Sequence, residues 1–272
     1  MIEVKNISKS LPNGKILLND LSFSVKQGEF VGILGASGAG KTLTLRCLNG
    51  LLKPDSGEVL VSNNNGEMQD ISTLNKKNLR IARSKIGVIF QGYNLVKRLS
   101  VLENIMIGKL GQINPWRSIF YGFTDAEATA AMEVLERFKM AHLANNPTGS
   151  LSGGEMQRVA IARAMFQEPQ VLLADEPISN LDPGNAQMIM EIIAPLAATV
   201  PVIGVFHQPE MTAKYCTRVI ALKEGRIIYD GNPNLSFTQL NEIYGEELQK
   251  VVTTKVTQDT NALNLTPTIN EL

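Results

Sequence analysis

The sequence contains few cysteines, and the two that are present, Cys47 and Cys216, are not spaced as a set of metal ligands. A disulfide framework and a cysteine zinc site are therefore not expected, and a reduced, cytosolic chain is the simplest interpretation. We interpret Cys47 as a small buried apolar residue rather than as a nucleophile.

An excess of one charge is also lacking, because 26 basic residues balance 26 acidic ones. This composition does not favour a nucleic-acid partner. No apolar run approaches the roughly 18 residues that indicate a membrane-spanning helix. The first residues, Met1–Lys5, lack the basic-then-apolar pattern of a secretion signal. What is present is a hydrophobic content of 44% in 272 residues, which supports one large or two small globular domains.

A glycine-rich loop follows the apolar run Phe30–Leu34 and matches the pattern G-x-x-x-x-G-K-[ST]. Its glycines allow successive backbone N–H groups to turn towards an anion. The next helix, expected over Lys41–Leu48, would direct the positive end of its dipole at the same anion. We therefore predict a phosphate site in which Lys41 reaches the β- and γ-phosphates and the Thr42 hydroxyl binds Mg²⁺. The loop consists of Gly35, Ala36, Ser37, Gly38, Ala39, Gly40, Lys41 and Thr42.

Four apolar runs end in residues that are suited to nucleotide chemistry. The runs do not alternate with polar residues, which is typical of strands covered on both faces in a parallel sheet. Ligands of such sheets lie beyond the carboxyl ends of the strands. The runs are Phe30–Leu34 before the glycine-rich loop, Ile86–Phe90 before Gln91, Val171–Ala174 before Asp175 and Glu176, and Val202–Phe206 before His207. Together they predict an α/β protein with a nucleotide-hydrolysing site at one edge of its sheet.

The polar residues at these strand ends have distinct predicted roles. Asp175 would hold Mg²⁺, and Glu176 would act on the attacking water as a general base or an orienting group. The amide of Gln91 can contact both the metal and the water, and His207 can bind the γ-phosphate and hold Glu176. The alternative for Asp175 and Glu176 is a surface Asp-Glu-Pro turn, and the alternative for His207 is a structural histidine. We interpret the other histidine, His142, as structural.

A second anion site is predicted where an alanine-rich helix, Val159–Phe166, is preceded by a cap and two glycines. The chain already has one phosphate loop, so the second site needs an explanation. A symmetric homodimer supplies one, because each ATP would lie between the loop of one copy and this segment of the other. The segment contains Ser152, Gly153, Gly154 and Glu155.

With these motifs the chain resembles the ATP-binding subunits of ABC transporters. The segment Leu151–Arg158 is similar to the family signature, Val171–Pro177 to the Walker B strand, and Ser179–Asp182 to the D-loop, while His207 is similar to the switch histidine. The resemblance implies a RecA-like P-loop NTPase core with N-terminal antiparallel strands and an inserted α-helical subdomain. It also implies that Asp182 and the signature residues contact nucleotide.

The expected organisation is a single ATPase domain over residues 1–247. Its core would comprise residues 1–91 and 167–247, and its helical subdomain residues 92–166. Residues 248–272 form a polar tail without aromatic residues, which we expect to be flexible or partly ordered.

A closer resemblance is to the phosphonate-import ATPases, carried by Leu99–Asn104, Trp116–Ser118 and Glu242–Gly245. Relatives thought to import phosphite or phosphate share these markers. The resemblance implies a homodimer at the cytoplasmic face of the inner membrane, docked on two integral permease subunits. A separate substrate-binding protein would deliver the transported anion.

The chain departs from the family pattern at two positions. Leu11 stands where an aromatic residue usually stacks on adenine, an interaction worth roughly 1–3 kcal/mol per base. Leu43 stands where a hydroxyl residue usually contacts a phosphate, although its backbone N–H remains. We therefore expect a working ATPase with weakened affinity for ATP.

Two other classes of protein share part of this pattern. A soluble ABC ATPase of DNA repair or translation would fit the motifs, but the neutral charge and the single ATPase unit disfavour it. A P-loop kinase would not need the Ser152 segment. A GTPase would need Asn-Lys-x-Asp, whereas Asn75–Asn78 ends in asparagine.

Overall fold

The computed structural model describes residues 1–62, 66–113 and 122–247. The predicted polar tail, residues 248–272, and the marker Trp116–Ser118 lie outside these ranges. None of the described helices is both long and apolar enough to cross a membrane.

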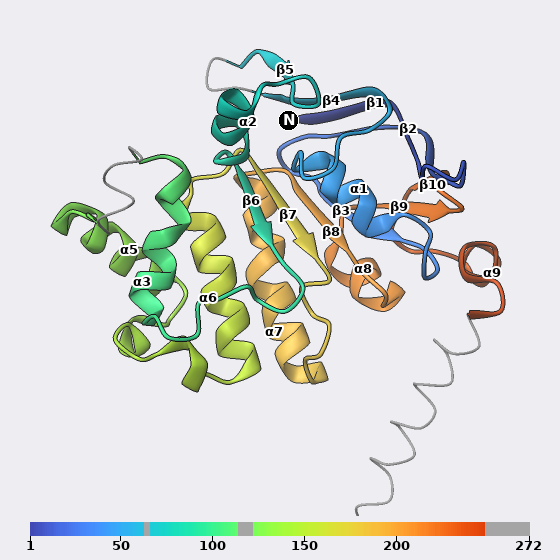
Figure 1. The fold of residues 1–272 in the computed structure, drawn as a ribbon. Helices are drawn as coiled ribbons and strands as arrows, with labels where there is room; N and C mark the ends of the chain where they lie inside the picture. Colours follow the sequence, from blue (N-terminus) through green and yellow to red (C-terminus); the bar gives the residue numbers. More distant parts are fainter. Residues whose placement is uncertain (63–65, 114–121, 248–272) are drawn as a thin grey trace, which may run out of the picture.

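Strands and helices alternate along most of the chain (Figure 1). The strands are β1 Ile2–Ser10, β2 Ile16–Val25, β3 Phe30–Leu34, β4 Ser56–Ser62, β5 Met68–Asp70, β6 Ile86–Ile89, β7 Val171–Asp175, β8 Val202–Val205, β9 Arg218–Lys223 and β10 Arg226–Gly231. The α-helices are α1 Lys41–Leu48, α2 Lys76–Arg83, α3 Val101–Met106, α5 Asp125–Arg137, α6 Gly153–Phe166, α7 Pro183–Ile193, α8 Pro209–Tyr215 and α9 Phe237–Tyr244. Short 3₁₀ helices are η1 Ile107–Gly111, η2 Ala141–Leu143, η3 Thr148–Ser150 and η4 Ala194–Ala198.

The central six-stranded sheet has the order β10-β9-β3-β8-β7-β6. Its strands pair in parallel except β10, which runs antiparallel to β9. All residues of β3 and β8 are buried, as the unbroken apolar runs predict for strands covered on both faces.

The register of this sheet explains how distant residues meet. Ile89 of β6 pairs with Ala174 of β7, and Ala174 pairs with Gly204 of β8. Gln91 and Glu176 each lie two residues beyond this row. Since parallel strands present their carboxyl ends at one edge, the polar residues that follow them gather there.

A second, antiparallel sheet of order β2-β1-β4-β5 covers one side of the core. Its inward residues, such as Leu18 and Leu21 of β2, pack in one hydrophobic cluster with Leu45 and Leu48 of α1 and with the central sheet. Cys47 is buried in this cluster, and burial raises the pKa of its thiol to about 11. The thiol therefore stays protonated at neutral pH, consistent with a packing role.

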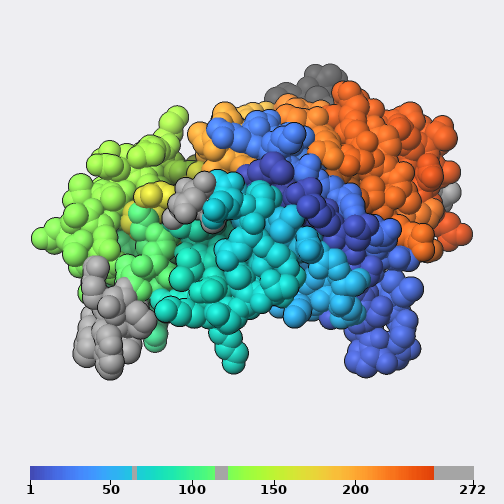
Figure 2. Space-filling view, turned by 90° about the horizontal axis from the view of Figure 1, so that it is seen from above, coloured from blue at the N-terminus to red at the C-terminus, as the bar shows by residue number. Residues whose placement is uncertain are grey.

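The described part of residues 92–166 contains helices and no strand. Helices α3, α5 and α6 share a hydrophobic core of their own, which includes Ile105, Leu135 and Val159. Each of the three helices begins with a capping box, in which a Ser or Thr side chain and a Glu three residues later satisfy each other's backbone N–H groups. This helical subdomain, green in Figure 2, projects at one end of the molecule.

Candidate active site

The glycine-rich loop connects β3 to α1 through three glycines with positive φ. A Cβ on Gly35 (φ +151°) would lie 2.4 Å from the carbonyl oxygen of Leu222, so only glycine fits there. Gly38 and Gly40 also have positive φ, which glycine adopts without steric cost. The loop therefore keeps its backbone free to face a ligand.

Lys41 is folded back onto this loop. Its Nζ donates to the carbonyl oxygens of Gly35 at 2.7 Å and Ala36 at 3.0 Å. Burial lowers the pKa of Lys41, and the nearby carboxylates of Glu176, Glu247 and Asp175 counter this effect. A buried ammonium held by two carbonyl oxygens can exchange them for phosphate oxygens, which bind it more strongly.

Thr42 and Asp175 lie where a cation would be held. The Thr42 hydroxyl donates to Asp175 Oδ1 at 3.3 Å. Burial raises the pKa of Asp175, and the adjacent Glu176 adds to this, whereas the Thr42 hydrogen bond opposes it. A hydroxyl and a carboxylate are the oxygen ligands that Mg²⁺ prefers, so this pair fits that ion. No cluster of three or more His, Cys, Asp and Glu side chains suited to a metal occurs among the described residues.

Glu176 is held by one residue on each side. Its Oε1 lies 2.7 Å from Nε2 of His207, and its Oε2 accepts a hydrogen bond from Nε2 of Gln91 at 2.9 Å. Glu176 has φ +49°, a left-handed conformation that is uncommon outside glycine and is often found at functional sites. The side chains that follow β6, β7 and β8 thus form one hydrogen-bonded group.

Two members of this group, Glu176 and His207, border a pocket of about 240 Å³. The pocket therefore joins the predicted phosphate loop to the predicted general base. Its lining residues are Ser37, Gly38, Ala39, Gly40, Lys41, Thr42, Leu43, Glu176 and His207.

The signature residues are not among those that line this pocket. Ser152 caps α6 through a capping box in which Glu155 Oε2 accepts from the Ser152 N–H at 2.8 Å, and these hydrogen bonds lower the pKa of Glu155. A Cβ on Gly153 would lie 3.1 Å from the Tyr93 hydroxyl oxygen, and one on Gly154 would lie 2.6 Å from Asn185 Oδ1.

Two other predicted nucleotide contacts also lie apart from the pocket lining. Asp182 caps α7, and hydrogen bonds from Asn185 hold its pKa low. Leu11, between β1 and β2, is 42% exposed. Within one copy of the chain, the structure therefore brings together the loop, Gln91, Asp175, Glu176 and His207, but neither the signature segment nor Asp182.

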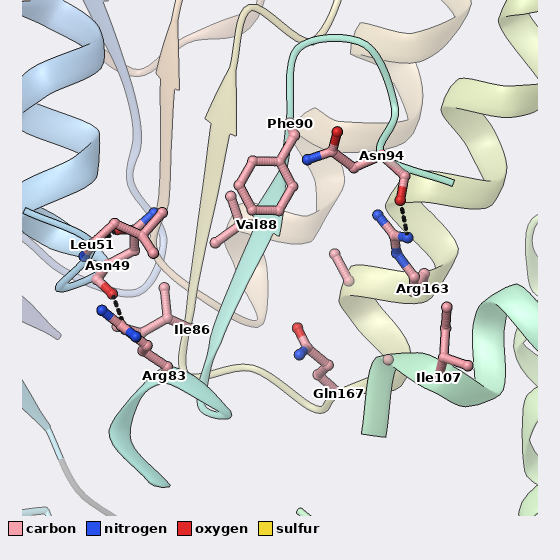
Figure 3. A pocket seen from close by; sticks show the side chains of 12 residues that line it. Asn49, Leu51, Arg83, Ile86, Val88, Phe90, Asn94, Ile107, Arg163 and Gln167 are labelled. Carbon is pink, nitrogen blue, oxygen red and sulfur yellow. Dashed lines mark hydrogen bonds between the residues drawn. The ribbon is translucent and has the colours of Figure 1, made fainter. Parts of the chain in front are cut away.

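A groove of about 340 Å³ lies between the core and the helical subdomain (Figure 3). Two arginines line it. Arg163 of α6 donates to the carbonyl oxygens of Tyr93 and Asn94 at 3.0 and 2.7 Å, and Arg83 of α2 donates to that of Asn49 at 3.2 Å. A neighbouring cavity of about 440 Å³ shares Asn49, Leu51, Val88, Phe90 and Asn94 with this groove and extends to Gln91 and Asp175.

Sequence reasoning missed this groove and a further contact. Ser37 N donates to Glu247 Oε2 at 3.1 Å, although 210 residues separate the two. No motif signals such a contact, because it depends on where α9 packs.

Residues 18–179 match the family model for ABC transporters. The phosphonates import ATP-binding protein PhnC of Treponema denticola is 40% identical over 97% of this chain and all of its own length. That of Bdellovibrio bacteriovorus, with the same name, is 40% identical over 92% of this chain and 96% of its own.

Solved structures agree with this assignment. The dimeric ATP-binding cassette MJ0796 bound to ADP and Pi is 30% identical, with a TM-score of 0.71 over 87% of this chain and all of that one. The ABC transporter component cbiO1 of Clostridium perfringens is also 30% identical, with a TM-score of 0.73 over 97% of this chain and 95% of that one. The predicted P-loop core with an inserted helical subdomain is thereby confirmed. The chain belongs to the ABC transporter family, as a member of its phosphonate-import group of ATP-binding proteins.

Proposed function

We propose that this chain is the ATP-hydrolysing subunit of an importer for phosphonates or a related small phosphorus oxyanion. The observation that carries the proposal is the position of Glu176, which borders the phosphate-loop pocket with Gln91 and His207 on its two carboxylate oxygens. The names of the relatives support the substrate class, because those proteins share about 40% of their residues with this chain over nearly its whole length.

The proposed mechanism begins at the glycine-rich loop. The loop N–H groups and Lys41 bind the β- and γ-phosphates, and Lys41 gives up its two carbonyl partners to do so. Thr42, Asp175 and Gln91 are the residues that would hold Mg²⁺, which when bound neutralises charge on the phosphates.

Glu176 then acts on water. Its carboxylate accepts a hydrogen bond from the attacking water and directs the water oxygen at the γ-phosphorus while the bond to the leaving ADP oxygen breaks. His207 keeps the carboxylate oriented and, because it lines the same pocket as the glycine-rich loop, would bind the γ-phosphate. Catalysis consists of positioning and charge stabilisation, because phosphoryl transfer asks little else of the protein.

The working unit in this proposal is a homodimer. Ser152, Gly153, Gly154, Glu155 and Asp182 lie outside the pocket of their own chain, so a second copy is needed to supply them to the nucleotide. The dimeric form of the relative MJ0796 supports this arrangement.

The groove beside the helical subdomain is the proposed contact for the permease. It opens between the core and the helices, it carries Arg83 and Arg163, and its neighbouring cavity reaches Gln91. When the γ-phosphate binds or leaves, Gln91 would change position and shift the helical subdomain, and a permease segment bound in the groove would shift with it. Two permease subunits would hold the dimer at the cytoplasmic face of the inner membrane, with a substrate-binding protein on the opposite side.

The test is transport by the assembled complex. The chain, its cognate permease subunits and its binding protein are reconstituted in vesicles with ATP and Mg²⁺, and uptake of labelled methylphosphonate, phosphite and phosphate is compared. We expect uptake of a phosphorus oxyanion that stops with Glu176→Gln. Hydrolysis that proceeds without permease and drives no uptake would instead indicate a soluble ATPase.

A further inference from the structure

A carboxylate from the end of the described chain contacts the phosphate loop. Glu247 Oε2 accepts a hydrogen bond from the backbone N–H of Ser37, with 3.1 Å between the two atoms. Ser37 is one of the residues that line the 240 Å³ pocket of this loop. A carboxylate oxygen and a phosphate oxygen are the same kind of ligand for such an N–H group, since both are anionic acceptors.

Well-packed residues hold Glu247 close to the loop. Helix α9 ends at Ile243 and Tyr244, which are only 2% and 5% exposed and pack against Ala221 of β9. Gly245 follows with φ +53° and ψ −128°, a conformation that suits glycine and turns the chain out of the helix. Glu247 lies two residues after this turn, so the packed end of α9 fixes the position from which its carboxylate reaches the loop.

The charge of Glu247 also acts on the lysine of the loop. Its negative charge raises the pKa of Lys41 and so counters part of the burial effect that lowers it. Glu247 thus places a negative charge near Lys41 and the glycine-rich loop, as a bound phosphate would.

We propose that Glu247 is an internal competitor for the phosphate loop. Its carboxylate occupies the Ser37 N–H in the nucleotide-free chain and leaves when phosphates bind, so that the segment Tyr244–Glu247 reports and regulates occupancy of the site. This inference rests on the proposed function, because it requires that the loop binds ATP. With such a competitor, only the fraction of molecules in which Glu247 has left the loop can bind nucleotide. The apparent Kd for nucleotide equals the intrinsic Kd divided by that fraction.

The experiment compares the full chain with Glu247→Gln and with Glu246→Gln as the matched control. Glu246 is exposed and lies next to Glu247 in the chain, and its substitution by glutamine removes the same single negative charge. Titration calorimetry with ADP and Mg²⁺ should give about three- to tenfold tighter binding for Glu247→Gln and less than a twofold change for Glu246→Gln. The difference in ADP affinity between Glu247→Gln and the wild type should be smaller in 1 M salt, because salt screens a charge that lies near the surface.

Thermal unfolding gives an independent measure. Glu247→Gln should lower the melting temperature without nucleotide, because the amide oxygen is a weaker acceptor than the carboxylate, and should enlarge the increase produced by ADP. A residue with only a structural role would lower the melting temperature without improving binding.

The outcomes separate the two proposals. If neither the wild type nor a variant binds ADP, the ATP site itself is wrong and the inference fails with it. If all three proteins bind ADP equally, or if Glu247→Gln binds it more weakly, the proposed nucleotide site is supported and the proposal that Glu247 competes for it is wrong. Equal tightening by Glu246→Gln would reveal a general charge effect and would also overturn it.

Discussion

Gln91 Nε2 lies 2.9 Å from Glu176 Oε2, although 85 residues separate them in the sequence. The other oxygen of that carboxylate lies 2.7 Å from His207 Nε2. Gln91, which follows β6, and His207, which follows β8, thus each contact one oxygen of Glu176. These contacts fix the direction of the side chain before any substrate arrives, so a change of charge at this position should affect turnover far more than folding.

Glu176→Gln is expected to reduce kcat roughly 10²- to 10⁴-fold, the usual contribution of a general base. Glutamine keeps the size of the side chain but lacks the negative charge that activates water. Phosphate release and ATP binding are measured on the same preparation, and binding should persist. Glu136→Gln, on the exposed face of α5, serves as the control. Normal turnover by Glu176→Gln would place the general base elsewhere.

Asp175→Asn is expected to stabilise the nucleotide-free protein at pH 7. Burial raises the pKa of Asp175 above its ordinary 3.8, so the folded state binds the proton more tightly than the unfolded state does. The contribution of this residue to stability therefore falls as pH rises from about 3.8 through the raised pKa. Because the carboxylate is partly exposed, solvent screening should keep the gain at neutral pH below about 1 kcal/mol.

Urea unfolding at pH 7 and pH 4 tests this sign, and the difference between wild type and Asp175→Asn should shrink at pH 4. Addition of ATP and Mg²⁺ should stabilise the wild type more than the variant. Asp182→Asn offers a contrast, because hydrogen bonds lower the pKa of Asp182 and its charge favours the folded state. A loss of stability in Asp175→Asn at pH 7 would contradict the electrostatic argument.

Gly35→Ala is expected to destabilise the fold by more than about 2 kcal/mol, because its Cβ would clash with the carbonyl oxygen of Leu222 at 2.4 Å. Gly14→Ala is the matched control. Gly14 also has positive φ, +83°, but an added Cβ meets nothing within 4 Å, so only the backbone strain of about 1 kcal/mol remains. The midpoints of urea unfolding give the stability of both variants. Equal losses of stability would show that the backbone near Leu222 shifts and removes the clash.

Leu11→Tyr is expected to tighten ATP binding about fivefold or more, since stacking on a base contributes roughly 1–3 kcal/mol. Leu11 is 42% exposed, so the larger ring can be accommodated. Ile81→Tyr, on α2 and 55% exposed, adds the same ring away from the pocket and should change nothing. Fluorescence titration with a labelled ATP analogue measures the three proteins. Unchanged affinity of Leu11→Tyr would mean that adenine does not reach this position.

Sequence patterns predicted the local structure near the site closely. Helix α1 was expected over Lys41–Leu48 and has those bounds, and β3 was expected over Phe30–Leu34 and has those bounds. Strands β6 and β8 end one residue before the expected Phe90 and Phe206. The patterns succeed because glycine conformation and unbroken apolar runs are local properties of the chain.

Long-range features could not be predicted in this way. The contact of His207 with Glu176 was expected and is present, whereas the hydrogen bond from Gln91 to the other oxygen of Glu176 was not expected, because it depends on the order of the strands. The contact of Glu247 with Ser37 depends on where α9 packs. The roles of the site residues remain predictions from motif and geometry.

The pairing of Ile89 with Ala174, and of Ala174 with Gly204, has a consequence for how the molecule acquires its chemistry. A slip of one residue would displace Glu176 by about 3.3 Å and turn every side chain of β7 to the opposite face. No misaligned sheet could therefore retain part of the activity. Recovery of hydrolysis after refolding should consequently require the native register of β7 in each copy before two copies can pair, so a preparation that regains activity has regained this register.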